Sequence, residues 1–395
     1  MAITSAFVGD ASQFARRALI VTQELPVPFD RHVWQEAMTL TEHGYIVSVI
    51  CPKGKGCDAS YELINNVHIF RHPKTSGSLL WQMMLACRIF FTLGFDVIHI
   101  CNPPDSIVFL GSFFKLFFSK KLLFEQRSLG PELHEQQSQM HKIALWFERV
   151  NFKLADVGIV ANESYRKIAI ERGKVSPQKL FVVRPAPALD HIKPASAIPS
   201  LKQGRKYLVA YVGNMNKQAG IPHLIEAARI IVQDMKRDDV HFTLAGDGPM
   251  LERLRKLVAM QGVVEHVTFT GLLSDKEMLE LLSTADVCVE PREVNPATDK
   301  FTASKIMEYM ALGKPVVQFD TTEGRITAGE AALYAKPNDT QDLTQKITAL
   351  LDDPAKRKEI GTSGRARMES KLSWAFEVPK LLAAYDALFE IPKKD

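Results

Sequence analysis

The sequence predicts an α/β fold with two domains, each built on a doubly wound parallel sheet. The chain has 395 residues, which is long for one compact domain and suits two domains of roughly 150–200 residues. In both halves, short apolar runs rich in β-formers alternate with segments of helical periodicity. A proline-rich break interrupts this alternation. We therefore expect an N-terminal domain over 1–189, a linker over 190–206 and a C-terminal domain over 207–373.

The first half begins with a short apolar strand and an amphipathic helix. The helix is expected over 31–43 and ends at Gly44, since glycine commonly follows the last helical residue. The strands expected in this half are 18–22, 45–50, 67–70, 96–100, 121–124, 157–160 and 180–183.

The second half repeats the same alternation. Its expected strands are 207–212, 241–245, 267–269, 287–289 and 316–318. Its expected helices are 221–233, 249–260, 275–283, 303–312, 341–351 and 374–390. Two α/β halves of similar size predict an interdomain cleft, and such clefts are favoured ligand sites.

Composition excludes several classes of protein. Apolar residues make up 46% and charged residues 24% of the chain, which excludes a disordered, collagenous or coiled-coil protein. A net charge of +4 suits anionic substrates or an anionic membrane surface better than nucleic acid. The N-terminus lacks the basic start and apolar run of a signal peptide, and no apolar run reaches the ~18 residues of a membrane span.

The cysteines are few and scattered. They are Cys51, Cys57, Cys87, Cys101 and Cys288. Because no C-x-x-C pair occurs, neither a disulfide framework nor a zinc site is expected, and a reducing cytoplasmic location is predicted.

Small or polar residues follow four of the expected strands in the second half. They occur as Gly-Asn, Gly-Asp-Gly-Pro, Thr-Gly and Glu-Pro-Arg-Glu. The carboxyl ends of parallel strands line ligand sites, and glycine lets a ligand approach the backbone. Tight turns alone also need glycine, but four such turns in register favour a nucleotide-sized ligand. The candidate residues are Gly213, Asn214, Gly246, Gly248, Gly271 and Glu293.

The segment 299–315, DKFTASKIMEYMALGKP, predicts a loop and then a helix capped at Thr302 or Ser304. Lys305 and Glu308 are three residues apart and share one face of that helix. A helix N-terminus beside a lysine is an anion site, and a carboxylate one turn on can accept hydrogen bonds from a ribose diol. The pair therefore suits a nucleoside diphosphate; the alternative is a solvated Lys–Glu pair on an exposed helix.

These segments resemble a known family. The series GNMNKQAG, AGDGP, FTG, ADVCVEP and SKIMEYMALGKPVV is similar to that of retaining glycosyltransferases of family 4, which have the GT-B fold. Three segments of the first half match the family's acceptor-binding half: LPVPFDRHVWQEAMTLTEHGYIVSVICPKG, FEQRSLGPEL and ADVGIVANESY. LSWAFEVPKLLAAY resembles its closing helix, so the resemblance implies that residues 374–395 pack back onto the first domain.

The chain departs from the family's donor-side pattern. Of the usual E-x7-E pair, Glu308 matches the second glutamate, which implies ribose binding, while Lys300 stands at the first. Asp299, beside it, is the candidate for the donor-sugar contact, with Glu293 further upstream.

The family's diphosphate-binding arginine and lysine are also replaced. They fall on Asn214 and Ala219, with Lys217 between them. Lys305 is the better remaining cation for the phosphates.

The acceptor-side pattern is altered as well. Where the family often carries H-D-x-x-P-E, this chain has Arg127, Ser128, Pro131 and Glu132. Arg127 is the candidate to replace the histidine as a donor to a phosphate or sugar oxygen. Asp30, Arg31, Glu132 and His99, which precedes the segment CNPPD, are the other acceptor-side candidates. His32, His134 and His141 are expected to have no role.

The resemblance implies transfer of a sugar from a nucleotide sugar to a glycan or lipid-linked hydroxyl in surface glycan assembly. It implies no cofactor and no metal, and no metal-ligand spacing occurs in the sequence. Two rivals remain. An epimerase of the same fold would act on the nucleotide sugar without an acceptor, and a non-catalytic partner subunit would explain the altered motifs. An epimerase would convert the nucleotide sugar without an acceptor, whereas a transferase would not. Binding of a nucleoside diphosphate would distinguish an enzyme from a non-catalytic subunit.

Residues 106–124 are rich in phenylalanine and lysine. The cluster comprises Phe109, Phe113, Phe114, Phe117 and Phe118 with Lys115, Lys120 and Lys121. One interpretation is a helix that lies on the inner face of a membrane, with its lysines at lipid phosphates. The other is a core helix of the first domain with a basic end.

Overall fold

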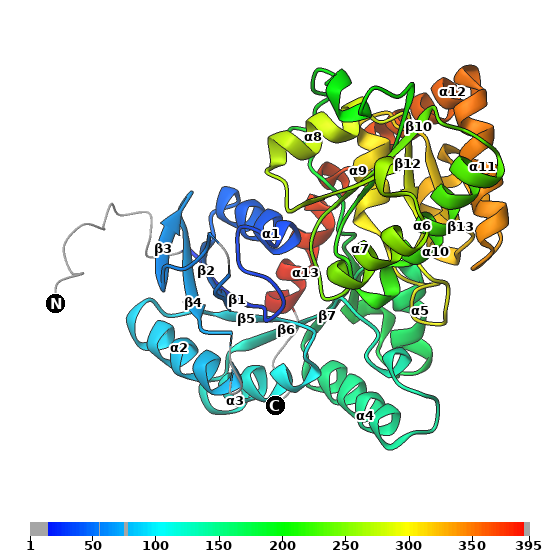
Figure 1. Cartoon of the computed structure of the whole chain (residues 1–395). Helices are drawn as coiled ribbons and strands as arrows, with labels where there is room; N and C mark the ends of the chain where they lie inside the picture. Colours follow the sequence, from blue (N-terminus) through cyan, green and yellow to red (C-terminus); the bar gives the residue numbers. More distant parts are fainter. Residues whose placement is uncertain (1–14, 55, 75–77, 391–395) are drawn as a thin grey trace. The chain divides into compact units, whose positions relative to one another are not determined.

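The computed structural model describes residues 15–54, 56–74 and 78–390. The N-terminal segment, for which no signal peptide is expected, lies largely outside these residues. The chain divides into two compact units, which we call unit 1 (Met1–Arg184 with Val378–Asp395) and unit 2 (Pro185–Glu377) (Figure 1). Unit 1 is therefore built from both ends of the chain, and unit 2 is continuous.

Unit 1 contains an eight-stranded sheet in the order β3-β4-β2-β1-β5-β6-β7-β8. Its strands are β1 (Arg17–Val21), β2 (Ile46–Pro52), β3 (Tyr61–Ile64), β4 (Val67–His72), β5 (Val97–Cys101), β6 (Lys121–Gln126), β7 (Val157–Val160) and β8 (Leu180–Val182). Seven of them match the expected strands to within two residues at each end.

The expectation of a purely parallel sheet is wrong at one edge. Strand β3 pairs antiparallel with β4. The two strands are joined by Asn65 and Asn66, whose φ angles are 47° and 63°. Asparagine tolerates positive φ in the tight turns that join antiparallel strands, so the Asn-Asn pair is a hairpin signal that the strand assignment overlooked.

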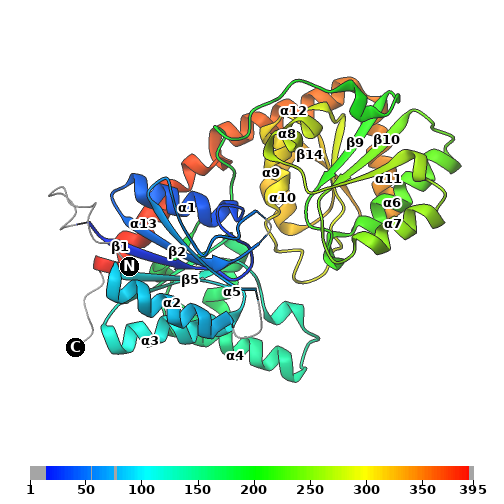
Figure 2. The same cartoon turned by 60° about the vertical axis from the view of Figure 1, so that its left-hand side comes forward.

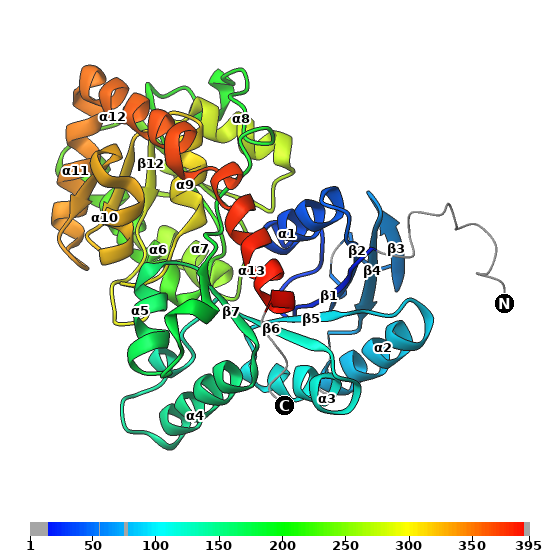
Figure 3. The ribbon, with the colours of Figure 1, turned by 180° about the vertical axis from the view of Figure 1, so that it is seen from behind.

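Helices cover both faces of the sheet in unit 1 (Figure 2). Helices α1 (Arg31–Glu42) and α13 (Val378–Glu390) lie on one face, and Figure 3 shows α13 alongside α1. The opposite face carries α2 (Ser78–Thr92), α3 (Val108–Phe118), α4 (Gln139–Leu154) and α5 (Glu163–Glu171). The apolar core on that side includes Ile98, Ile100, Phe114 and Phe124. Among the described residues, no helix is long and apolar enough to cross a lipid bilayer.

Unit 2 contains a six-stranded, all-parallel sheet in the order β11-β10-β9-β12-β13-β14. Its strands are β9 (Tyr207–Val212), β10 (Val240–Ala245), β11 (Val267–Gly271), β12 (Val287–Glu290), β13 (Val316–Phe319) and β14 (Ala332–Ala335). The sequence did not predict β14, whose four residues are too short and too rich in alanine to stand out.

The two sheet faces of unit 2 carry separate apolar cores because side chains alternate along each strand. In β9, Val209 and Tyr211 pack with α6 (Ile221–Arg229), α7 (Leu251–Met260) and α11 (Thr340–Asp352). Leu208 and Ala210 face α8 (Asp275–Thr284) and α9 (Ser304–Ala311) instead. The remaining helices, α10 (Thr322–Ala328) and α12 (Pro354–Arg367), were not predicted.

The segment 190–206, expected to be a linker, packs within unit 2. The side chain of Ile192 lies in the core beside α8. Ala195 and Ile198 donate backbone N–H groups to the hydroxyls of Ser283 and Thr284, at 2.9 and 2.8 Å. Pro194 and Pro199 therefore lie in an ordered strap rather than a flexible connection, and the chain passes between the units at Arg184–Pro185.

In both units, an aspartate directly before one strand forms hydrogen bonds with the backbone at the start of the neighbouring strand. The carboxylates of Asp96, Asp156 and Asp286 accept from the backbone N–H of Arg17, Leu122 and Leu208, at 3.0, 2.8 and 2.8 Å. Each aspartate N–H donates to the carbonyl of the same residue at 2.8 Å. A valine follows each aspartate, so the pair x-Asp-Val marks a strand start.

We expect Asp286→Ala to lower the free energy of unfolding of unit 2 by about 1–3 kcal/mol, because the N–H of Leu208 loses its partner where water has little access. Lys202, which lies 2.8 Å from the Asp286 carboxylate, also loses its ion pair. Urea denaturation measures the change. Asp352→Ala, at an exposed helix end, should lie within about 0.5 kcal/mol of the parent; equal losses in both variants would contradict this role of Asp286.

Candidate functional site

Four neighbouring strands of unit 2 end in the residues that the sequence singles out. In sheet order, Gly271 ends β11, Gly246 follows β10, Gly213 follows β9 and Glu290 ends β12. The N–H of Gly213 donates to the carbonyl of Ala245 at 2.9 Å, and the N–H of Gly246 donates to that of Gly271 at 2.8 Å. These bonds extend the sheet ladder by one residue and hold the three glycine turns in register.

Gly246 lies so close to Gly213 that no other residue fits there. Its φ angle is 135°, and a Cβ at this position would stand 1.9 Å from the carbonyl oxygen of Gly213. Because Gly213 and Gly246 have no side chains, the backbone at the carboxyl ends of β9 and β10 is not covered by side chains of these two residues. This arrangement supports the expectation of a ligand that approaches the backbone.

Lys305 carries a buried ammonium at this edge of the sheet. Its Nζ lies 3.0 Å from the Glu290 carboxylate and donates to the hydroxyl of Tyr211 at 3.0 Å. Burial lowers the pKa of Lys305, but the charge of Glu290 outweighs it and the pKa is raised. Burial likewise raises the pKa of Glu290, but Lys305 and Arg292 outweigh it and the pKa is lowered. Both groups are therefore charged at neutral pH.

Arg292 adds a second cation to this cluster. Its Nε donates to Glu290 at 2.9 Å, and the guanidinium lies 4.5 Å from the ring centroid of Phe301. Two cations on one carboxylate leave a net positive charge, which favours an anionic ligand. Sequence reasoning did not assign roles to Glu290 and Arg292. The available signal was a carboxylate directly after the buried strand residues Val287–Val289.

Helix α9 begins without a side-chain cap. Its N-cap is Ala303, which makes no side-chain hydrogen bond, so the predicted cap at Thr302 or Ser304 is wrong. Uncapped N–H groups in the first turn favour an anion at that end of the helix. Glu308 lies one turn further along α9 and is half-buried. The structure therefore places Lys305 and Glu308 on α9 as the sequence predicts.

Asp299 is occupied by contacts within unit 2. Its two carboxylate oxygens accept from the backbone N–H and the hydroxyl of Thr322, at 2.8 and 2.9 Å. Asp299 thus fixes the start of α10, which the sequence could not foresee because α10 was not predicted. The donor-sugar role of Asp299 stays a prediction, as does the expectation that the adjacent, half-buried Lys300 faces the diphosphate.

The other donor-side candidates lie in the loops beyond the strands. Asn214, Lys217 and Glu293 are exposed, whereas Ala219 is buried. The N–H of Glu293 donates to the carbonyl of Gln218 at 3.2 Å. The backbone of Gly248 lies against Met215 and Asn214, since an added Cβ would meet both within 3 Å. The loops after β9, β10 and β12 are thus in mutual contact.

In unit 1, the structure brings Asp30 and Arg127 together. The two Nη atoms of Arg127 donate to the Asp30 carboxylate at 2.9 and 3.1 Å. The same carboxylate caps α1 by accepting from the N–H of Val33. The side-chain oxygen of Asn102 fixes the loop by accepting from the N–H groups of Arg127 and Ser128. Arg127 is therefore held in one orientation, and its guanidinium is already engaged.

Two further acceptor-side candidates behave differently. Arg31 is exposed at the start of α1. Glu132 forms an ion pair with Arg172 at 2.6 Å, and Arg172 also pairs with Glu148 at 2.6 Å. Glu132 therefore has a structural partner that the sequence did not reveal.

His99 is fully buried, so from this position it does not reach an acceptor. Side-chain alternation places it on the sheet face beneath α1 and α13, where its Nδ1 lies 3.1 Å from the hydroxyl of Tyr385. Its Nε2 faces the carboxylate of Glu125 at 3.6 Å. The prediction of a cleft position for His99 is corrected to a core position.

His99 belongs to a buried cluster in the interior of unit 1. It consists of His32, Glu36, His99, Cys101, Glu125 and Tyr385. Nε2 of His32 lies 2.7 Å from Glu125 and 3.6 Å from Glu36. Burial lowers the pKa of His32, but the two carboxylates outweigh it and raise the pKa to about 9. Burial and the charge of Glu125 raise the pKa of Glu36 to about 7. The ligand atoms of His32, Glu36 and Glu125 lie within 4.8 Å of one another.

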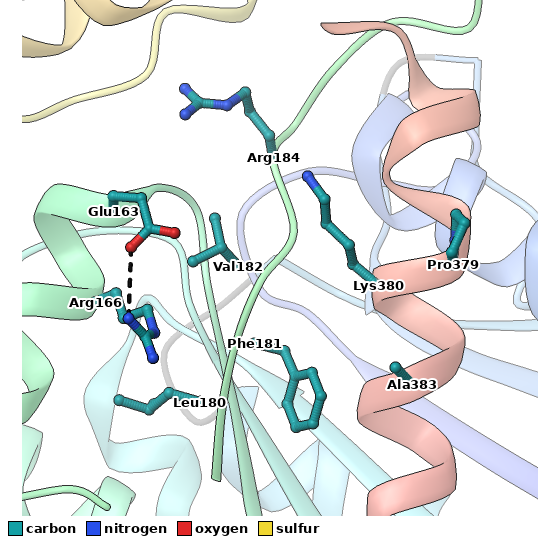
Figure 4. A pocket seen from close by; sticks show the side chains of 9 residues that line it. All are labelled: Glu163, Arg166, Leu180, Phe181, Val182, Arg184, Pro379, Lys380 and Ala383. Carbon is teal, nitrogen blue, oxygen red and sulfur yellow. Dashed lines mark ion pairs between the residues drawn. The ribbon is translucent and has the colours of Figure 1, made fainter. Parts of the chain in front are cut away.

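Unit 1 also contains an open cavity of about 470 Å³ beside β8 and the first turns of α5 and α13. Figure 4 shows Arg184 and Lys380 near the apolar side chains of Val182 and Phe181. Arg166, at the same cavity, pairs with Glu163 at 3.7 Å. Three cations and one carboxylate above an apolar floor suit an amphiphilic anion. This pocket has no signature in the sequence, because its residues come from separate elements of the chain.

The Glu290 cluster predicts a specific dependence of stability on pH. The lowered pKa of Glu290 means that its contribution is present above its ordinary pKa, near 4.5, and is lost as the pH falls through the folded value. We expect Glu290→Gln to cost about 3 kcal/mol at pH 7, because two largely buried cations lose their buried partner. Denaturation at several pH values should show the gap closing in acid; a gap that does not change with pH would contradict this assignment.

Comparisons with known proteins identify the family of this chain. Residues 193–367 match the family model "Glycosyl transferases group 1", and residues 30–189 match "Glycosyltransferase Family 4". The chain is 27% identical over 323 residues to alpha-D-kanosaminyltransferase of Streptomyces kanamyceticus, covering 78% of this chain and 81% of that protein.

Two solved structures have the same architecture. Sucrose-phosphate synthase from Thermosynechococcus elongatus superposes with a TM-score of 0.80 at 20% identity, over 95% of this chain and 99% of that one. HepE of Anabaena, solved in complex with UDP-glucose, superposes with a TM-score of 0.72 at 16% identity, over 94% and 99%. The family models match consecutive halves of the chain, and the solved structures share the fold of its two sheets. This chain therefore belongs to the family 4-type glycosyltransferases of the GT-B fold.

Proposed function

We propose that the protein transfers a sugar from a nucleotide-sugar donor to a hydroxyl acceptor, with retention of the anomeric configuration. One observation carries this proposal: a buried, charged Lys305 lies at the uncapped start of α9, beside the glycine turns that end three neighbouring strands. That arrangement suits a nucleoside diphosphate. The complex of HepE with UDP-glucose, a structure of the same fold, supports this ligand class. A donor screen that measures release of nucleoside diphosphate tests the proposal.

In the proposed reaction, the bond between the anomeric carbon and the diphosphate oxygen breaks, and the acceptor oxygen bonds to the same face of that carbon. The acceptor proton passes to an oxygen of the leaving phosphate. Negative charge grows on the diphosphate as the bond breaks, so fixed positive groups lower the barrier. Lys305, Arg292 and the first turn of α9 supply that charge. We accordingly propose that transfer needs neither a cofactor nor a metal at the diphosphate.

For the remainder of the donor, Glu308 is proposed to bind the ribose diol and the glycine turns at Gly213, Gly246 and Gly271 to admit the nucleotide. The donor-sugar contact is proposed for Asp299, with Lys300 and Glu293 nearby in sequence. Because both oxygens of Asp299 hold Thr322, a sugar hydroxyl would share this carboxylate with Thr322. A carboxylate has about four lone-pair sites, so two donors do not exhaust it.

The acceptor is proposed to bind unit 1, with Asp30, Arg31, Arg127 and Glu132 on its side. The fixed orientation of Arg127 suits a group that positions an acceptor oxygen. The cavity lined by Arg166, Arg184 and Lys380 supports an acceptor that carries an anionic group on an apolar chain or ring. A lipid-linked intermediate of surface glycan assembly meets that description.

Peripheral contact with an anionic membrane is proposed for the face of unit 1 that carries α2, α3 and α4. Each of these helices exposes large apolar side chains, among them Phe91 (76%), Phe117 (73%) and Trp146 (53%). Of the predicted lysines, Lys115 is engaged by Asp156 at 2.6 Å and Lys120 lies 3.9 Å from Asp96. The cations are instead proposed to come from α4, whose exposed Lys142, Arg149 and Lys153 accompany Trp146.

Nucleotide binding should depend on Lys305 and Glu308. Lys305→Ala and Glu308→Ala should each weaken binding of the matching nucleoside diphosphate by about 1.5–3 kcal/mol, because each removes a charge-assisted hydrogen bond. Calorimetry measures the affinity, with circular dichroism to verify the fold. Lys358→Ala, on the exposed surface of α12, serves as the control. Unchanged affinity in both site variants would remove the basis for the assignment.

The second prediction separates two roles of Asp299. If Asp299 contacts the donor sugar, Asp299→Asn loses turnover while free nucleoside diphosphate still binds. If Asp299 only fixes α10, the same variant is less stable by about 1 kcal/mol but transfers sugar at a near-normal rate. Steady-state kinetics and thermal melting distinguish the outcomes. Near-normal transfer in Asp299→Asn, together with an inactive Lys300→Ala, would move the sugar contact to Lys300.

The third prediction concerns the membrane. The triple variant Lys142→Gln, Arg149→Gln and Lys153→Gln should sediment less with anionic vesicles, since each cation near the surface contributes about 1 kcal/mol. Binding should also weaken with salt. The matched control changes Lys167, Lys174 and Lys179 to Gln, which removes the same charge outside helices α2, α3 and α4. Equal loss in both triple variants would indicate a non-specific effect of net charge and contradict the assigned face.

A further inference from the structure

The buried cluster in unit 1 contains polar atoms without hydrogen-bond partners in the described part of the chain. They include both oxygens of Glu36, Oε2 of Glu125 and Nε2 of His99. Glu36, His99 and Glu125 are at most 1% exposed. A buried acceptor without a donor costs about 1–3 kcal/mol, and a buried carboxylate costs more. Several such atoms around one point indicate a group that satisfies them together.

We propose that unit 1 binds one divalent transition-metal ion of the Zn²⁺ class at His32, Glu36 and Glu125, with His99 as a fourth ligand. Imidazole nitrogen and carboxylate oxygen are common zinc donors. The two carboxylates balance the charge of a dication, and His32 binds it after releasing the proton that the carboxylates stabilise in the absence of an ion. The proposal does not depend on the proposed donor or acceptor, because none of these residues belongs to the diphosphate site of unit 2.

Three of the four ligands already surround one point, since the ligand atoms of His32, Glu36 and Glu125 lie within 4.8 Å of one another. Ligand atoms bound at about 2.1 Å around a tetrahedral ion lie about 3.4 Å apart. Nε2 of His32 lies 3.6 Å from Glu36 and 2.7 Å from Glu125, and Nε2 of His99 lies 3.6 Å from Glu125. The His32–Glu125 contact must widen by about 0.7 Å. His99 groups with Glu125 and Cys101, not with His32 and Glu36, so its ring must move toward them to become the fourth ligand. The hydroxyl of Tyr385 at Nδ1 of His99 orients that ring, as outer partners of metal ligands commonly do.

Regular secondary structure supplies these ligands. His32 and Glu36 are four residues apart on α1 and therefore share one face of the helix. Glu125 and His99 occupy the neighbouring strands β6 and β5, where His99 pairs in register with Leu123. Ligands on rigid elements preserve a site better than ligands on loops. Their sequence spacing carries no metal motif, because α1, β5 and β6 come together only in the fold.

The test begins with the full-length protein, purified without a metal-affinity tag. Elemental analysis by mass spectrometry should find about one zinc per chain. After prolonged dialysis against a chelator, titration with Co²⁺ should give the visible absorption of a tetrahedral site, saturating at one equivalent and displaced by Zn²⁺. Zn²⁺ should also raise the melting temperature of the metal-free protein. Less than a tenth of an equivalent of any transition metal, with no tetrahedral Co²⁺ spectrum, would overturn the proposal.

Variants then assign the ligands. Glu36→Gln and His32→Gln should each weaken Co²⁺ affinity at least tenfold, whereas Glu42→Gln and His43→Gln, at the exposed end of the same helix, should not. Cys101→Ser should retain binding, although Cys101 lies close to His99 and Glu125. Loss of Co²⁺ binding in Cys101→Ser with retention in Glu36→Gln would overturn this ligand set. If a site variant does not fold, the metal content and Co²⁺ spectrum of the unmodified protein still decide whether the ion binds.

Discussion

The buried ion pair between Lys305 and Glu290 is the constraint on which the candidate site of unit 2 depends. An ammonium removed from water needs an anion in contact, and Glu290 supplies it from the end of β12. The same contact fixes where the free side of the ammonium points. Gly213 completes the arrangement, because a Cβ at that position would stand 2.6 Å from Nζ of Lys305. The lysine, the glutamate and the glycine are therefore interdependent, although they lie in three separate segments.

The two units use charge in different ways on related frameworks. In unit 2, charged groups gather at the carboxyl ends of the strands, where the glycine turns keep the backbone accessible. In unit 1, a buried cluster rich in histidine and glutamate lies between the sheet and helices α1 and α13. The opposite face of that sheet is filled by phenylalanine, leucine and isoleucine. Unit 1 thus has an apolar core layer on one face of its sheet and a layer of mixed polar and apolar side chains on the other.

The sequence predicted features that depend on local pattern. Most strands, the glycine turns and the placement of Lys305 and Glu308 on one helix follow from periodicity and turn chemistry. Features that depend on distant contacts were not predictable in this way. The strap at 190–206 is ordered by Ser283 and Thr284, and Asp299 is held by Thr322. Likewise, nothing near His99 in the sequence indicates that Tyr385, 286 residues away, covers it.

The division of unit 1 between both ends of the chain has a consequence for assembly. Its sheet and helices α1–α5 are synthesised early, but α13, which covers the face holding His99, is synthesised last. Until α13 emerges, a polar interior remains open to water. Unit 2 is continuous and can fold first. Its own fold then joins the two ends of its segment, because the N–H of Trp374 donates to the carbonyl of Pro187 at 3.0 Å. Folding of unit 2 thereby shortens the loop that must close when α13 packs onto unit 1, which lowers the entropic cost of completing unit 1.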